Sequence, residues 1–216
     1  MNHILACTCI SVSHVLSKNV KPLDPKKKVN VEWFFTHAVI NFIISCTTIE
    51  SVIESLRYPM LSTMHSNDTF INFPMCIILW IHFYHVVFFK ITNEDMFHHV
   101  LFVSLLPLPG YVYDWGILKN CLAFFICGFP GALIYTLLVF QKCGYFINIK
   151  EEKFSAFVNL YIRTPGILIS AMILYKCYIN GVCLAPTWAV VLQFIIGPFN
   201  AVYYTKQSIE RYIRKL

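Results

Sequence analysis

Six long apolar stretches constrain the fold of this chain more than any other feature of its sequence. A transmembrane helix needs about 20 mostly apolar residues, with a tolerance of roughly 17 to 25. Stretches of this kind run over residues 31–52, 70–89, 95–113, 118–140, 154–175 and 186–204. Because the connections between them are short, we expect one compact membrane domain: an all-α, polytopic transmembrane bundle with six spans.

The overall composition argues against a soluble domain. Of the 216 residues, 57% are hydrophobic and only 13% are charged, whereas soluble domains carry about 25% charged residues. A soluble fold of this length could not cover so much apolar surface. The sequence also contains neither a Gly-x-Ser-x-Gly elbow nor a phosphate-cradling glycine-rich loop, so no motif supports a soluble enzyme.

The distribution of basic residues predicts the orientation of the bundle. With six spans, thirteen lysine and arginine residues fall on the side of the two termini, and three fall on the opposite side. Cytosolic loops are enriched in such residues, so both termini should be cytosolic. The glycosylation sequon Asn67-Asp68-Thr69 lies in the first loop, which the same count places on the lumenal side. Basic clusters can also bind nucleic acid, but membrane-flanking charge is the favoured interpretation, and no nucleic-acid partner is predicted.

The chain divides into three predicted parts. Residues 1–30 should form a cytosolic segment with a helix at the membrane interface, residues 31–204 the six-helix membrane domain, and residues 205–216 a basic cytosolic tail. The stretch 31–52 is the weakest span, because polar residues such as Glu32 and Asn41 interrupt it. Five crossings are the alternative, and they would place the termini on opposite sides. Proline and glycine inside several stretches indicate helices packed against one another, since neighbours must satisfy the freed backbone groups.

The most concentrated polar set is Glu94-Asp95-Met96-Phe97-His98-His99, at the cytosolic entry of the third stretch. On a helix, Glu94 and His98 are neighbours, as are Asp95 and His99, because residues four apart share a face. A carboxylate that orients an imidazole is the arrangement of a general-base histidine. The alternative is structural: the carboxylates suit a helix N-terminus, and the histidines can bond to neighbouring helices.

Other polar residues fall within the apolar stretches, where ionisable groups are costly and indicate a functional site. His82 and His85 could line one polar pocket with the two adjacent histidines. Asn159 and Arg163 lie four residues apart in the fifth stretch, and the depth of Arg163 requires a partner such as Asp95, a helix carbonyl or a lipid headgroup. Clustered histidines also bind iron, but no histidine follows His99, so neither a metal nor a cofactor is predicted.

Three stretches, in this order, resemble the TLC-domain family, the membrane fold shared by ceramide synthases and several lipid-regulating proteins. They are residues 94–100, residues 159–163, and residues 199–204 with Asn200. The resemblance covers residues 31–216 and implies a location in the endoplasmic reticulum membrane, a membrane-lipid substrate and an acyl-CoA donor. The family's catalytic histidines would fall on His98 and His99. The paired aspartates of ceramide synthases are missing, since Asp114 stands alone.

Three functions are compatible with these features. The first is a histidine-dependent acyl transferase of the sphingolipid type, with His98 or His99 as the general base and Glu94 or Asp95 as its orienting group. Its ligand-binding residues would be Arg163, Asn159, Asn200 and His85. The second is a non-catalytic protein of lipid binding, lipid homeostasis or trafficking, and the third is a histidine-ligated di-iron lipid oxidoreductase.

Overall fold

The computed structural model describes residues 1–64, 69–145 and 147–216, and every regular element within these ranges is helical. The predicted all-α class is therefore confirmed for the described chain. Two residues of the predicted sequon, Asn67 and Asp68, lie outside the described residues.

Helix α1 (Asn2–Ser17) is followed by six helical rods, and each predicted apolar stretch lies on one of them. Three rods are single helices: α2 (Lys28–Arg57), α3 (Phe73–Phe88) and α10 (Thr187–Ile213). Each of the other three consists of shorter helices joined end to end. The first contains α4 (Asn93–Phe97), η3 (His98–Val103) and α5 (Pro107–Val112), and the second contains α6 (Leu118–Ala123), η4 (Phe124–Gly128) and α7 (Phe129–Lys142). The third contains α8 (Asn148–Val158), η5 (Asn159–Arg163) and α9 (Thr164–Ile179). Short 3₁₀ turns, η1 (Pro25–Lys27) and η2 (Pro59–Leu61), flank α2.

Three helical stretches in the described chain are long and apolar enough to cross a membrane. They are Pro25–Arg57, Leu118–Lys142 and Ile149–Ile179, while α3 is apolar but has only 16 residues. The first of them contains the stretch 31–52, which the sequence marks as the weakest span. These helices support a membrane protein, and the count of six crossings stays a prediction.

Several polar residues in the first half of α2 are buried, although Glu50 and Glu54 near its end are exposed. Glu32, His37 and Asn41 are all buried, and Glu32 is paired with Lys18 of the segment after α1 at 2.8 Å. Phe42 and Ile53 are instead exposed. Membrane bundles place polar residues in this way, toward the interior and away from lipid.

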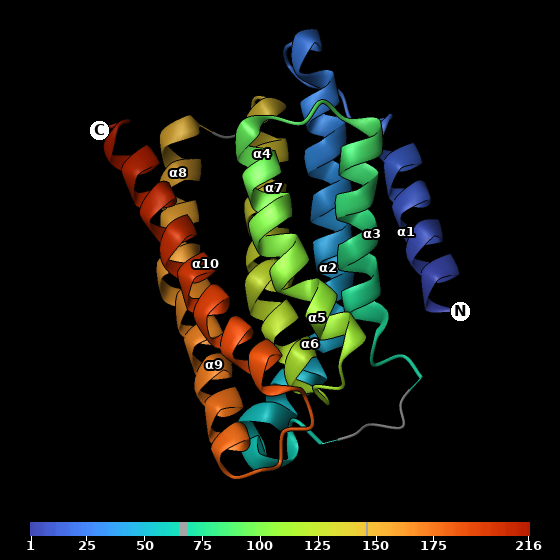
Figure 1. The fold of residues 1–216 in the computed structure, drawn as a ribbon. Helices are drawn as coiled ribbons and strands as arrows, with labels where there is room; N and C mark the ends of the chain where they lie inside the picture. The colour runs from blue at the N-terminus through green and yellow to red at the C-terminus, as the bar shows by residue number, and fades with distance from the viewer. Residues whose placement is uncertain (65–68, 146) are drawn as a thin grey trace.

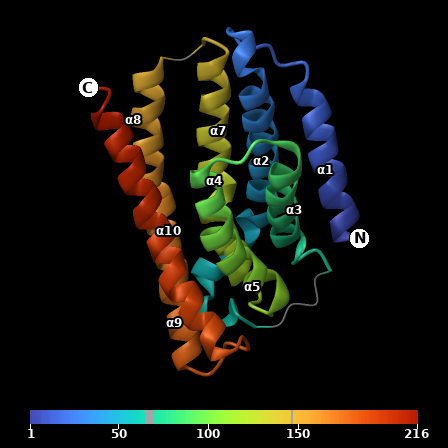
Figure 2. The same ribbon diagram turned by 45° about the horizontal axis from the view of Figure 1, so that its top comes forward.

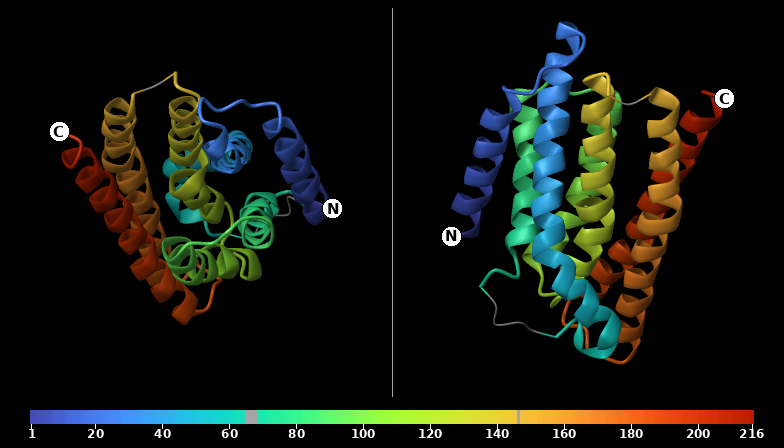
Figure 3. Two further views of the ribbon diagram at one scale, coloured as in Figure 1. Left: turned by 90° about the horizontal axis from the view of Figure 1, so that it is seen from above. Right: turned by 180° about the vertical axis from the view of Figure 1, so that it is seen from behind.

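The six rods form a closed ring, with α1 outside it (Figures 1 and 2; Figure 3, left, views the ring from above). In one direction around the ring, α2 contacts the rod of α6 and α7. The rod of α6 and α7 in turn contacts the rod of α8 and α9, on which α10 packs. On the other side α2 contacts α3, which packs against α5. Between α10 and the rod of α5, Gln193 Nε2 donates hydrogen bonds of 3.0 Å to the carbonyls of Leu105 and Leu106.

Each composite rod contains a π-helical turn just before a proline. The prolines are Pro107, Pro130 and Pro165, and each follows η3, η4 or η5 within a few residues. A proline ring clashes with the carbonyl four residues earlier and cannot donate a backbone hydrogen bond. In all three rods that carbonyl belongs to the π-helical turn, where the wider backbone relieves the clash. Pro198 in α10 is accommodated without such a turn.

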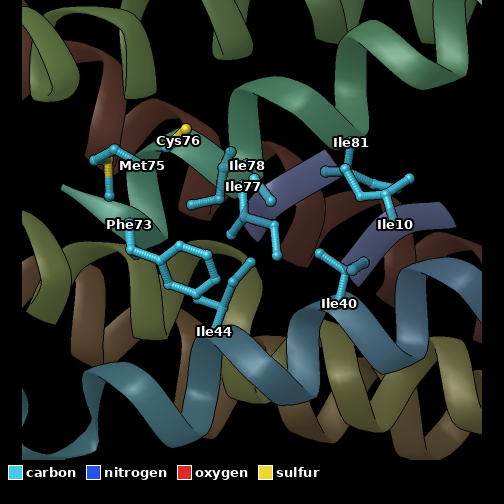
Figure 4. Packing of buried hydrophobic residues seen from close by; sticks show 11 residues of the cluster. Ile10, Ile40, Ile44, Phe73, Met75, Cys76, Ile77, Ile78 and Ile81 are labelled. Carbon is cyan, nitrogen blue, oxygen red and sulfur yellow. The ribbon is translucent and has the colours of Figure 1, made fainter. Parts of the chain in front are cut away.

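Helix α1 docks lengthwise on α2 and α3 and not across the ends of the rods; its place at the membrane interface stays a prediction. Ile10 of α1, Ile40 of α2 and Ile81 of α3 belong to one buried cluster (Figure 4). His3 Nδ1 accepts a hydrogen bond of 2.9 Å from Trp80 Nε1, and His14 Nδ1 lies 2.5 Å from the hydroxyl of Tyr84. Apolar packing and these two bonds therefore set the direction of α1.

Candidate functional site

The ring encloses a cavity of about 510 Å³ that is lined by residues of all six rods. We call the end where α4 and α8 begin the upper end; it lies at the top of Figure 1. Polar and charged side chains line the cavity there and in its middle. Lower down, toward Trp115 and Leu174, the lining is mostly apolar, and the exceptions are Ser170 and the buried Lys119, which is bonded to Asn72. A chamber of this kind, polar at one end and apolar at the other, suits an amphiphilic ligand.

Two stripes of side chains at helical spacing form much of the polar wall. Along α8, η5 and α9 the stripe runs through Glu151, Ser155, Asn159 and Arg163, each four residues from the next; along α10 it runs through Gln193, Gly197, Asn200 and Tyr204. Residues three or four apart lie on one helix face, so both stripes look into the cavity. The predicted ligand-binding residues of the fifth and sixth stretches therefore meet in one place.

A chain of hydrogen bonds joins Tyr204, His98 and His82. The hydroxyl of Tyr204 lies 2.6 Å from His98 Nδ1, and His98 Nε2 lies 3.0 Å from His82 Nε2. His82 Nδ1 lies 2.7 Å from the carbonyl oxygen of Ile78. We call these three side chains the relay.

The direction of the relay follows from its last bond. A carbonyl can only accept, so His82 Nδ1 donates to Ile78, and Nε2 of neutral His82 must accept. His98 therefore donates from Nε2, and its Nδ1 accepts the hydroxyl proton of Tyr204. The carbonyl of Ile78 thus fixes the tautomer of His82 directly and that of His98 through His82. In this arrangement a proton can pass from the Tyr204 hydroxyl to His98 and from His98 to His82.

The second pair of histidines lies beside the relay. His85 Nδ1 is 3.1 Å from His99 Nε2, and the rings of His82 and His99 are 5.3 Å apart. Trp33 of α2 stacks on His85 at 3.8 Å between ring centroids. The structure thus brings the four histidines close together and adds a tryptophan that the sequence did not single out. Of the four, His82 and His98 line the cavity, whereas His85 and His99 do not.

The predicted pairing of Asp95 with His99 is replaced by a helix cap. Asp95 Oδ2 accepts hydrogen bonds from the backbone N–H of Thr92 at 2.9 Å and from its hydroxyl at 2.7 Å, while Thr92 Oγ1 accepts from the N–H of Asp95 at 3.1 Å. This capping box satisfies free N–H groups at the start of α4. Glu94 is exposed and lines the upper end of the cavity. The side chain that orients His98 is His82, not a carboxylate.

Arg163 is held by Asn159 and by an aromatic ring. Its Nη1 donates to Asn159 Oδ1 at 3.3 Å, and its guanidinium carbon lies 4.6 Å from the ring centroid of Tyr204. Among the ion pairs of the described residues, none involves Arg163. The partner that the sequence suggested, Asp95, is engaged in the cap.

Several buried polar atoms along the cavity wall have no hydrogen-bond partner in the described structure. They are Arg163 Nε, His37 Nδ1 and both amide atoms of Asn200, whose side chain is 0% exposed. Leaving such a group unpaired costs about 1–3 kcal/mol. Native proteins rarely bear this cost without a reason, so these atoms are candidates for hydrogen bonds to a water or a ligand.

Metal binding has no support in the geometry. Within residues 1–64, 69–145 and 147–216, no group of three or more histidine, cysteine or acidic side chains is arranged to hold a metal ion. Both nitrogens of His82 and of His98 take part in the relay.

Sequence reasoning found much of this site and missed its hydroxyl. Tyr204 entered only as part of the motif at residues 199–204, and His37, one of the polar residues within the first stretch, was assigned no role. The signal for Tyr204 was its spacing, because it lies four residues after Asn200 and so on the same helix face.

Comparison of the chain with known proteins finds no matching family model, no matching curated protein and no matching solved structure. The resemblance to the TLC domain therefore rests on the three sequence stretches alone.

Proposed function

We propose that this chain transfers an acyl group from acyl-CoA to a membrane lipid. In this proposal it is a TLC-like, multi-pass protein of the endoplasmic reticulum membrane, with six spans and both termini in the cytosol. The observation that supports this proposal is the relay of Tyr204, His98 and His82 at the wall of a partly apolar cavity. General-base catalysis needs a proton acceptor of fixed tautomer within hydrogen-bond reach of the reacting group.

The proposed reaction begins with a hydroxyl or amine of the acceptor lipid against Tyr204. As the acceptor oxygen or nitrogen attacks the acyl carbonyl, its proton passes to the Tyr204 oxygen and the Tyr204 proton passes to His98 Nδ1. The bond from the acyl carbon to the sulfur of the donor breaks. The leaving thiolate then takes up a proton returned through the relay, so one ester or amide and one thiol replace the two reactants.

The apolar lower part of the cavity supports a lipid-sized occupant. Ile78, Leu106, Ile167, Ala171 and Leu174 line it, and ligand sites of this kind are concave and mostly apolar, with a few placed polar groups. An acyl chain would lie against these side chains. The reacting head would then lie among the polar residues above.

A non-catalytic lipid-binding protein is the second candidate, and one observation favours it. Both ring nitrogens of His98 are hydrogen-bonded within the protein, as they would be in a network that only fixes the helices. In that case the relay would stabilise the bundle and the same cavity would bind lipid without converting it. The di-iron alternative has no comparable observation.

Lipid profiles of cells that express variants separate the two candidates. Tyr204→Phe removes one hydroxyl and His98→Gln removes the proton acceptor, while Tyr161→Phe and His14→Gln make the same kinds of change outside the cavity. We expect the first two variants to lose a lipid product that the wild type and both controls form. An unchanged product level in Tyr204→Phe at equal protein abundance would reject acyl transfer through the relay.

A further inference from the structure

We propose that Arg163 and Asn200 form an anion site that binds the phosphate or carboxylate group of a long-chain amphiphile. The inference rests on the proposed function only in taking the occupant to be a lipid, and it does not require turnover. It specifies the ligand class: one end is an oxyanion and the other is a hydrocarbon chain.

The first observation is a partly buried cation, with its Nε atom fully covered, that has no counter-ion among the described residues. Arg163 lies on η5, in the middle of a rod, and forms no ion pair among the described residues. Asn159 satisfies one of its N–H groups through a neutral oxygen, and Nε has no partner. A buried charge normally requires a pairing partner. Because this part of the chain supplies none, a bound anion is the group that would complete the site.

The second observation is the amide of Asn200. It is fully buried, and neither Nδ2 nor Oδ1 has a hydrogen-bond partner in the described structure. It faces the same cavity as Arg163. The two helices are in contact at this level, since the hydroxyls of Thr164 and Thr205 lie 2.8 Å apart. Nδ2 of Asn200 and Nε of Arg163 are thus two unused donors on adjacent walls.

The acidic groups of the cavity do not replace this anion. Asp95 is bonded to Thr92, and Glu151 Oε1 accepts from Ser155 Oγ at 2.7 Å. Glu94 and Glu152 line the upper end, where Arg211 is also found. None of these four carboxylates forms an ion pair with Arg163 in the described structure. The charge of Arg163 is therefore available to a ligand.

The length of the apolar part indicates a long chain. Cavity-lining residues continue from Arg163 to Leu174 along one helix face, a rise of about 16 Å at 1.5 Å per residue. The hydrocarbon core of a bilayer is about 30 Å thick, so one leaflet accounts for roughly 15 Å. An acyl chain that normally fills one leaflet would fit between the anion site and the lower end.

The test measures binding to the purified, delipidated full chain in a non-ionic detergent. Two ligand pairs are compared at one chain length, lysophosphatidate with monoacylglycerol and a fatty acid with its fatty alcohol; in each pair the first member carries an anionic head group and the second a neutral hydroxyl. We expect the wild type to bind at least one anionic member about tenfold or more tightly than its neutral counterpart, the effect of a hydrogen-bonded charge. The pair that shows the larger preference identifies phosphate or carboxylate. Inorganic phosphate alone should bind much more weakly, since it lacks the chain.

Variants assign the preference to this site. Arg163→Gln should reduce it to within about twofold, Arg163→Lys should keep part of it, and Asn200→Leu should weaken it. Arg57→Gln, a matched change at the exposed end of α2, should leave it intact. Equal binding of charged and neutral ligands by the wild type would overturn the inference even if Arg163 variants fail to fold. A preference that survives Arg163→Gln would overturn it as well.

The outcome is separable from that of the proposed function. Tyr204→Phe should bind the anionic ligand with at least a third of the wild-type affinity, because its ring remains under Arg163, while losing any lipid product. Anion preference without a product in the wild type would reject acyl transfer and keep the anion site. A product without anion preference would reject the anion site and keep acyl transfer.

Discussion

The hydroxyl of Tyr204 and Nδ1 of His98 lie 2.6 Å apart, although 106 positions separate the two residues in the chain. The bond joins α10 to the π-helical turn η3, which belong to neighbouring rods of the ring. It gives His98 a hydroxyl to act on, and His82 gives it a fixed tautomer. The two bonds together distinguish His98 from an ordinary buried histidine.

Removal of the Tyr204 hydroxyl should affect activity much more than stability. General acid–base groups contribute typically 10²- to 10⁴-fold to a rate, whereas one hydrogen bond contributes about 1 kcal/mol to folding. We expect Tyr204→Phe to reduce product formation at least about 100-fold, and thermal denaturation to show a loss of only about 1 kcal/mol. A variant that unfolds in proportion to its loss of product would indicate a structural hydroxyl.

Replacement of Asn200 by leucine should stabilise the lipid-free protein. The amide is fully buried without partners, and such a group costs about 1–3 kcal/mol that an apolar side chain does not incur. We expect a gain of about 1 kcal/mol in chemical denaturation in detergent. Gln193→Leu is the matched control on the same helix: its amide donates two hydrogen bonds, so it should destabilise. Destabilisation by both variants would show that Asn200 has a structural role.

The cap at the start of α4 should behave as one unit. Thr92 and Asp95 satisfy each other's backbone N–H groups, so loss of either side chain removes most of the same interaction. Thr92→Ala and Asp95→Ala should each cost about 1 kcal/mol, and the double variant should cost little more than either one. Thermal denaturation of the four proteins measures the coupling. Additive losses would mean that Asp95 has a second partner, such as His99.

The docking of α1 should weaken at acidic pH. Burial, reinforced by the charge of Lys18 and opposed by that of Glu32, holds the pKa of His14 below its ordinary value of 6.5. The docked helix thus binds fewer protons than the released one, so docking is fully stable above pH 6.5 and weakens as the pH falls below it. Hydrogen exchange of residues 2–17, relative to α3, should rise between pH 7.5 and 5.5, after correction for the intrinsic rate. His14→Gln should abolish that rise, and a rise of equal size in the variant would assign it to another group.

The sequence predicted the rods better than it predicted the partners of side chains. Each apolar stretch lies on a helix because the length and hydropathy of a segment are local properties. The pairing of Asp95 with His99 had the correct spacing on an ideal helix. The Asp95 carboxylate bonds to Thr92 instead, because the free N–H groups at the start of α4 need an acceptor and compete with His99 for the same carboxylate oxygen. The sequence showed that Asn159 and Arg163 lie four residues apart, but it suggested other partners for Arg163 than the Asn159 oxygen that it bonds.

Contacts between rods could not be read from the sequence. The bond from Tyr204 to His98 and the stacking of Trp33 on His85 depend on how the ring closes. The direction of α1 also depends on tertiary packing, because its short apolar run suits a membrane surface as well as a helix groove. Spacing shows which residues share a face, and only the assembled ring shows which faces meet.

The π-helical turns have a consequence for how such a cavity can change. An α-helix advances about 100° per residue, and a π-helical turn holds one residue more than an α-helical turn. Each π-helical turn therefore rotates the side chains of the helix before it, about the rod axis, relative to the side chains of the helix after it. Deletion of Leu160 from η5 would swing Asn159 and Ser155 away from the cavity and leave Ile167 and Leu174 in place. Insertion or deletion of a single residue in η3, η4 or η5 could therefore change which side chains face the polar half of the cavity without changing those that face its apolar half.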